Sequence, residues 1–181
     1  MTTFVSVGNG NQPFSRLLDA VGSFVLKLPQ PVVVQNGQTP FRGTDCIIQP
    51  FVELGEYTQL IAEAELLILH AGAGSIIHSI QAGKVPVVMP RLAKYGEIVD
   101  DHQLELARAM AALGKVILAE EAGDLEKAVE KALQRRNSTL SIETPRMVRL
   151  IDDVLQEYAV RFKGSSNLIH GSRAVNKSRA A

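Results

Sequence analysis

A glycine-rich stretch in the middle of the chain combines residue types that bind anions. An aliphatic run over residues 66–69 is followed by His70 and then by Gly72, Gly74 and Ser75. Glycine lets the backbone turn tightly and leaves space for a ligand where a Cβ would otherwise stand. The residues that follow have a helical pattern, so the free N–H groups and the dipole of a helix N-terminus would favour a negative charge there. The stretch predicts a phosphate site, and the alternative is a tight turn that binds nothing.

A second glycine turn lies near the start of the chain. Gly8-Asn9-Gly10 follows a strand-like segment at residues 4–7 and precedes a helix that is expected to begin near Pro13. The order of strand, glycine turn and helix therefore occurs twice. If the two strands are neighbours in a parallel sheet, both turns lie at the sheet edge where such folds bind ligands, and they meet at one crevice.

Strand-like and helix-like segments alternate along the chain up to about residue 133. The strands are expected at residues 4–7, 31–35, 46–49, 66–69, 85–89 and 116–118. This alternation predicts a parallel sheet with helices on both faces. The expected fold is α/β, a Rossmann-like three-layer sandwich with a six-stranded parallel sheet and an additional C-terminal helix. In the strand order 3-2-1-4-5-6 the first and fourth strands are neighbours.

Three parts are expected along the chain. Residues 1–136 form the Rossmann-like domain, and residues 137–162 form a polar linker and a helix that packs on the domain or docks a partner. Residues 163–181 form a basic tail whose composition predicts disorder.

Composition excludes several classes of protein. The net charge of +0 over 181 residues gives no overall field that would favour nucleic acid. The single cysteine, Cys46, excludes an internal disulfide and a cysteine-based metal site. No signal peptide is recognisable, and no apolar run approaches the ~20 residues of a membrane-spanning helix. A soluble cytoplasmic protein is expected.

Other nucleotide-binding enzymes fit the residues less well. The first glycine turn lacks the third glycine of the dinucleotide fingerprint, and Gln35 and Asn36 stand where an acidic residue would hold a ribose. There is no Gly-Lys-Ser/Thr P-loop. A nucleotide-sugar epimerase would need a tyrosine followed four residues later by lysine, and none of Tyr57, Tyr95 and Tyr158 has one.

Three linked motifs are more specific than either glycine turn. They are His70-Ala71-Gly72-Ala73-Gly74-Ser75, Gly83-Lys84-x-Pro86 and Asp101-His102-Gln103-Leu104-Glu105-Leu106-Ala107. Together they resemble the C-terminal half of GT-B glycosyltransferases of family 28, over about residues 4–133. The resemblance is greatest to the UDP-GlcNAc-binding subunit of the eukaryotic dolichol-linked transferase and to PssE-type exopolysaccharide subunits, and the run at residues 89–97 looks PssE-like.

The resemblance implies which residues bind a UDP-sugar. They are Gly8, Asn9, Gly10, Phe51, Val52, His70, Gly72, Ala73, Gly74, Ser75, His78, Arg91, Asp101, His102 and Gln103. The two glycine turns would hold the diphosphate, Phe51 and Val52 would present backbone groups to uracil, and Gln103 would reach the sugar hydroxyls. The catalytic base is not identified by the sequence, and His70 and Glu97 are candidates. Arg91 would contact the diphosphate or a partner, or would be a solvated loop base.

One residue departs from the family pattern. His78 stands where relatives usually place Asp or Glu to hold the ribose hydroxyls, and a neutral imidazole accepts one hydrogen bond rather than several. This departure keeps open the alternative that the chain is a non-catalytic stabilising or regulatory subunit.

The resemblance also implies a partner and a reaction. A GT-B enzyme needs a second domain for the acceptor, here a membrane-associated PssD-type subunit. The pair would be a hexosyltransferase that moves a sugar, with inversion, from a UDP-sugar to a lipid-linked acceptor in exopolysaccharide synthesis. No metal, other cofactor or nucleic acid is expected. The chain would lie in the cytoplasm, at the inner face of the membrane through its partner.

Overall fold

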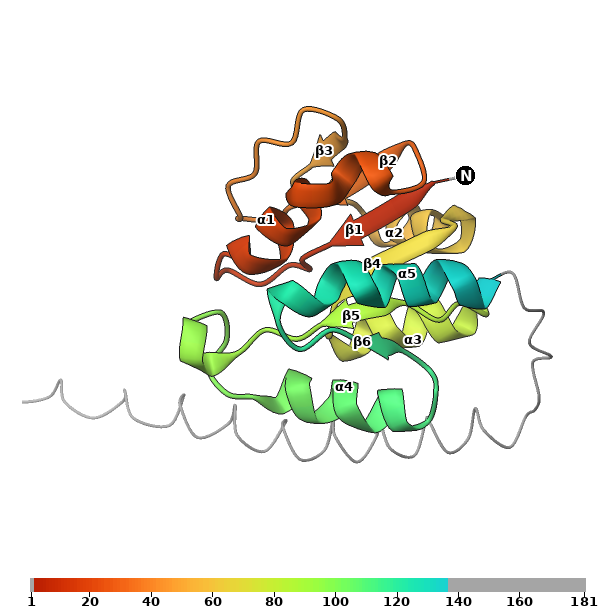
Figure 1. Cartoon of the computed structure of the whole chain (residues 1–181). Helices are drawn as coiled ribbons and strands as arrows, with labels where there is room; N and C mark the ends of the chain where they lie inside the picture. The colour runs from red at the N-terminus through yellow and green to blue at the C-terminus, as the bar shows by residue number, and fades with distance from the viewer. Residues whose placement is uncertain (1, 137–181) are drawn as a thin grey trace, which may run out of the picture. The chain divides into compact units, whose positions relative to one another are not determined.

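Six short parallel strands form the middle layer of the fold in the computed structural model, which describes residues 2–136 (Figure 1). The strands are β1 (Thr3–Ser6), β2 (Val32–Gln35), β3 (Ile47–Gln49), β4 (Leu66–His70), β5 (Val87–Met89) and β6 (Ile117–Leu118). Their order is β3-β2-β1-β4-β5-β6, and all five neighbouring pairs are parallel. The predicted six-stranded parallel sheet and its strand order are confirmed.

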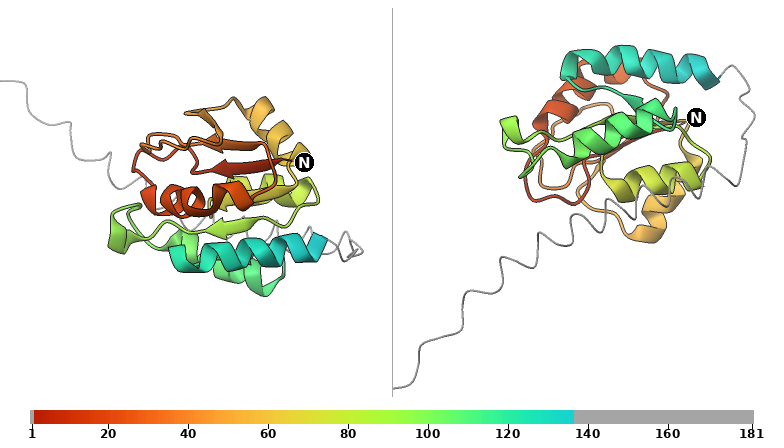
Figure 2. Two further views of the ribbon diagram at one scale, coloured as in Figure 1. Left: turned by 45° about the horizontal axis from the view of Figure 1, so that its top comes forward. Right: turned by 90° about the horizontal axis from the view of Figure 1, so that it is seen from below.

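Helices cover both faces of this sheet. They are α1 (Ser15–Phe24), α2 (Leu54–Glu63), α3 (Ala73–Gln81), α4 (His102–Ala112) and α5 (Leu125–Arg136). Helices α1 and α5 lie together on one face and α2 and α3 on the other, as Figures 1 and 2 show, while α4 packs against β6. Three short 3-10 helices complete the described elements: η1 (Val25–Lys27), η2 (Ala93–Tyr95) and η3 (Ala122–Asp124).

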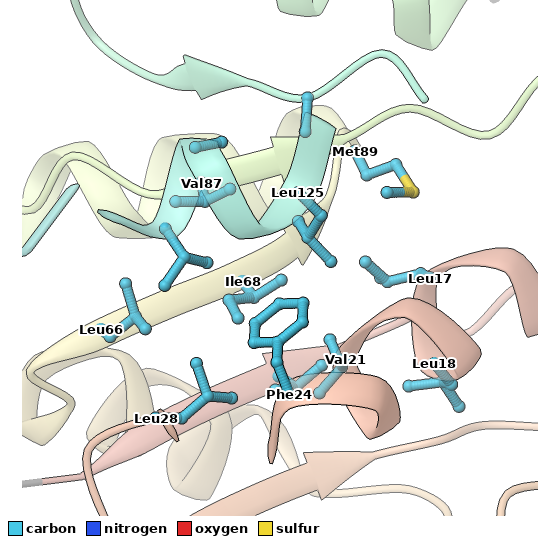
Figure 3. Close-up of a cluster of buried hydrophobic side chains, with 14 of the residues drawn as sticks. Leu17, Leu18, Val21, Phe24, Leu28, Leu66, Ile68, Val87, Met89 and Leu125 are labelled. Carbon is cyan, nitrogen blue, oxygen red and sulfur yellow. The ribbon is translucent and has the colours of Figure 1, made fainter. Parts of the chain in front are cut away.

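A cluster of buried apolar side chains fills the layer between α1, α5 and the sheet (Figure 3). Leu17, Val21 and Phe24 of α1 point into it and meet Ile68 of β4 and Leu125 of α5. The three α1 residues recur at helical spacing, which is why this helix has one apolar face. Burial of each such side chain contributes roughly 1.5–3 kcal/mol, so the cluster fixes α1 and α5 on the strands that lead to the glycine turns.

The register of the central strands places the two glycine turns side by side. Ser6 at the end of β1 lies opposite Gln35 of β2 on one side and Leu69 of β4 on the other. The turns that begin at Gly8 and Gly72 therefore leave the sheet from adjacent strands at the same edge. Helix α1 begins at Ser15, two residues later than Pro13, because Phe14 has non-helical dihedral angles (φ −124°, ψ 55°). The Phe14 N–H donates to the hydroxyl of Thr39 (2.9 Å).

Two predicted parts lie outside the described residues. These are the linker and helix over residues 137–162 and the tail over residues 163–181. Within residues 2–136, no helix is both long enough and apolar enough to cross a membrane.

Candidate functional site

A pocket of about 290 Å³ opens where the two glycine turns meet. Its lining consists of Gly8, Asn9, Gln35, Val52, Leu54, Tyr57, His70, Gly72, Gly74, Ser75 and His78. None of these lining residues of the described chain is acidic, and none is Lys or Arg. An anion in this pocket would therefore be held by neutral donors: backbone N–H, amide, hydroxyl and imidazole groups. Within residues 2–136, no three His, Cys, Asp or Glu side chains gather as a metal ion would require.

The N-terminus of α3 forms one wall of the pocket. The helix begins at Ala73 after Gly72, and no side chain caps it. The first N–H groups of a helix have no partner within the helix, so an uncapped end offers them to a ligand. A Cβ built on Gly74 would meet no atom within 4 Å, so the pocket is open at this point. The geometry suits a phosphate group.

The imidazole of His70 lies between the two glycine turns. A Cβ on Gly8 would stand 2.4 Å from His70 Cε1, and a Cβ on Gly72 would stand 2.3 Å from His70 Nε2. Gly8 also has a φ of 74°, which residues with a side chain rarely adopt. Both positions therefore need glycine for the ring to fit, and the ring in turn fixes the spacing of the two turns.

The environment of His70 keeps its ring neutral. Burial lowers the pKa of His70 to about 4, and the charge of Arg91 acts in the same direction, while a backbone hydrogen bond with Ser6 opposes it. The Nδ1 atom is buried and has no hydrogen-bond partner within the described part of the chain. A ring whose pKa is lowered to about 4 is a weak base, so these observations do not add support for His70 as the catalytic base, and that role stays a prediction.

We expect Gly72→Ala to lower the melting temperature by about 5 °C, measured by thermal unfolding. The backbone of Gly72 (φ −73°, ψ 136°) accepts alanine, and the nearest atoms to the new Cβ all belong to the His70 ring. The His70 ring must therefore shift from its place between the two turns.

A second substitution separates this crowding from other effects. His70→Ala in the Gly72→Ala background should restore the melting temperature to that of His70→Ala alone. The same substitution should not rescue Gly8→Ala, because the φ of 74° at Gly8 disfavours alanine whatever its neighbours. If Gly72→Ala stays equally unstable without the His70 ring, the ring is not what requires the glycine.

Arg91 supports the first glycine turn and does not line the pocket. Its guanidinium donates to the backbone oxygens of Val7 (2.9 Å), Gln12 (2.7 Å) and Glu97 (3.2 Å), and it lies over the ring of Phe14. Its side chain is almost completely buried, so the interpretation of Arg91 as a solvated loop base is wrong. The residue joins the loop after β5 to the loop after β1.

Glu97 is occupied by structural contacts. Its carboxylate accepts from Arg16 Nη2 (2.9 Å), from Arg16 Nε (3.1 Å) and from the backbone N–H of Leu92 (3.0 Å). The residue is buried and lies outside the pocket lining. Both oxygens of Glu97 hold the loop after β5, so we do not retain it as a candidate catalytic base.

The other predicted residues divide into two groups. Gly8, Asn9, Val52, His70, Gly72, Gly74, Ser75 and His78 come together in the pocket lining. Gly10, Phe51, Ala73, Arg91, Asp101, His102 and Gln103 are not part of that lining. Gln103 is buried at the start of α4, where its Oε1 accepts from the backbone N–H of Arg91 (3.1 Å), and Asp101 caps the N–H of Ala93 (2.8 Å).

Three lining residues were missed by the analysis of the sequence: Gln35, Leu54 and Tyr57. The Tyr57 hydroxyl donates to Ser75 Oγ (2.8 Å), and its ring packs edge-on against Phe4. Tyr57 lies in α2, and no local motif marks it. Gln35 stands at the end of β2 where a dinucleotide-binding protein would place an acid, and this position is the signal that the sequence offers.

The chain is similar to known glycosyltransferases. Residues 3–153 match the glycosyltransferase family 28 C-terminal domain. The structure is similar to that of the glycotransferase of kitacinnamycin, with a TM-score of 0.58 and 17% identity over 88% of this chain and 39% of the other. It also matches MurG of Acinetobacter baumannii, with a TM-score of 0.49 and 22% identity over 82% of this chain and 49% of the other. The chain thus spans less than half the length of either protein.

Proposed function

This chain belongs to the glycosyltransferase family 28 C-terminal domain family, and from that premise we propose that it binds the UDP-sugar donor of a glycosyltransferase. The observation that carries the proposal is the uncapped N-terminus of α3, which faces a pocket without acidic side chains. The diphosphate would lie against the turns at Gly8 and Gly72, and Val52 would lie near the uracil ring.

The proposed reaction is displacement at the anomeric carbon with inversion. The acceptor oxygen bonds to this carbon as the bond to the diphosphate oxygen breaks, UDP leaves with the electron pair, and the proton of the acceptor passes to a base. The N–H groups of α3 and the helix dipole would stabilise the charge that develops on UDP. His70 lies in the pocket, and the acceptor-binding part of the enzyme is the second candidate source of the base.

The proposed partner is a membrane-associated, PssD-type subunit that holds a lipid-linked acceptor for exopolysaccharide synthesis. The proposal rests on the resemblance of residues 89–97 to PssE-type subunits. The chain itself would then act at the cytoplasmic face of the membrane through that subunit.

The test is calorimetric titration of the full chain, alone and with the co-expressed partner, with UDP, UDP-sugars and uridine. We expect UDP to bind more tightly than uridine, because the diphosphate would contact the N-terminus of α3. The ranking of UDP-sugars would identify the donor. Absence of UDP binding in both preparations would contradict the proposal and favour the alternative of a stabilising or regulatory subunit, for which His78 is the motivating residue.

A further inference from the structure

A chain of side-chain hydrogen bonds runs beneath the first glycine turn. The Gly8 N–H donates to Ser6 Oγ (3.1 Å), the Ser6 hydroxyl donates to Gln35 Oε1, and Gln35 Nε2 donates to Asn9 Oδ1 (2.9 Å). Ser6 and Gln35 are 0% and 2% exposed, and they face each other in the register of β1 and β2. This series of hydrogen bonds therefore starts in the core and ends at the pocket.

The structure gives each bond a donor and an acceptor. The backbone N–H of Gly8 donates to the Ser6 hydroxyl, and the Ser6 hydroxyl donates to Gln35 Oε1. The oxygen of the Gln35 amide is then occupied, and its nitrogen donates to Asn9 Oδ1. What remains of the Asn9 amide is Nδ2, a group with two N–H donors, on a residue that lines the pocket.

We infer that Gln35 is a positioning residue that turns the Asn9 amide so that its N–H donors face a phosphate of the nucleotide. The inference rests on the proposed function and specifies how one wall of the pocket recognises the diphosphate. It also gives a role to the glutamine at the end of β2. The Gln35 side chain is directed to Ser6 and Asn9, so it acts on the ligand through Asn9.

The first test is Asn9→Asp, titrated with UDP and with uridine. Asn9 is exposed, so the substitution should leave the fold intact. Aspartate keeps an acceptor for Gln35 but presents a charged oxygen in place of Nδ2. We expect the affinity for UDP to fall at least about 30-fold and the affinity for uridine, which lacks phosphate, to change less than about twofold. Unchanged UDP binding in Asn9→Asp would overturn the inference.

The second test is a double-mutant cycle with Gln35→Met and Asn9→Ala. If Gln35 acts through Asn9, each single substitution weakens UDP binding about five- to tenfold, and the double variant is no weaker than Asn9→Ala. The inference would be overturned if the fold-losses in UDP affinity of the two single variants multiply in the double variant. It would also be overturned if Gln35→Met weakens the binding of UDP and of uridine equally. Wild-type protein that does not bind UDP at all would instead contradict the proposed function, so the two failures are distinguishable.

Discussion

We expect Gly74→Asp to weaken UDP binding at least about 100-fold without a loss of stability. The position accepts a side chain, because a Cβ on Gly74 would meet nothing within 4 Å. The new carboxylate would stand in the pocket at the N-terminus of α3, where it takes the N–H donors and repels the diphosphate. Two like charges about 5 Å apart at an effective dielectric constant of about 20 repel by roughly 3 kcal/mol, which corresponds to about 100-fold in affinity.

Two control variants separate charge from bulk in this experiment. Gly74→Ala adds the Cβ without charge and should weaken UDP binding less than about tenfold. Gly123→Asp adds the same charge in η3, also with open space around the new Cβ and outside the pocket lining, and should bind UDP as the wild type does. Calorimetry gives the affinities, and thermal unfolding reports whether each variant is folded. UDP binding by Gly74→Asp at wild-type affinity would mean that the diphosphate does not lie at α3.

The fold was predictable because its signals are local. Valine and isoleucine runs mark buried strands, and the glycine turns mark where two of them end, so the order of elements could be obtained without contacts between distant residues. Boundaries were less accurate where a distant partner decides them. The fifth strand was expected from residue 85, but β5 begins at Val87, because Pro86 has no N–H to donate to a neighbouring strand. The carbonyl of Pro86 still accepts from Ile117 of β6.

The site was predictable only in part because buried polar partners come from distant segments. The glycine turns and His70 are contiguous motifs, and the pocket contains them. For Arg91 the sequence predicts a contact with the diphosphate or a partner, or a solvated loop base, but the side chain reaches the carbonyl of Val7, 84 residues away in the sequence. Tyr57 meets Ser75 because α2 and α3 pack together on one face of the sheet. A sequence pattern shows residue types and their spacing, whereas the contacts of Arg91 with Val7 and of Tyr57 with Ser75 depend on how the loops and helices pack around the sheet.

Arg91→Met should lower the free energy of unfolding by about 3 kcal/mol, or the melting temperature by roughly 6–12 °C. Methionine fills much of the volume but leaves the carbonyls of Val7, Gln12 and Glu97 without their donor. Each unsatisfied buried acceptor costs about 1–3 kcal/mol, reduced where water enters. Arg91→Lys should recover only part of the loss, because a single ammonium cannot match the fork of the guanidinium.

A matched variant and a spectroscopic measurement make the role of Arg91 specific. Arg108→Met removes an exposed arginine that pairs with Glu120 (2.7 Å), and it should change the free energy of unfolding by less than about 1 kcal/mol. The charge of Arg91 lowers the pKa of His70, so in Arg91→Met the pKa of His70 should rise above its value of about 4, as followed by NMR titration of the ring protons. Equal stability losses in Arg91→Met and Arg108→Met, with an unmoved His70 titration, would show that Arg91 does not hold the glycine turn. A loss confined to Arg91→Met would show that the fold depends on the hydrogen bonds that Arg91 donates to the loop after β1.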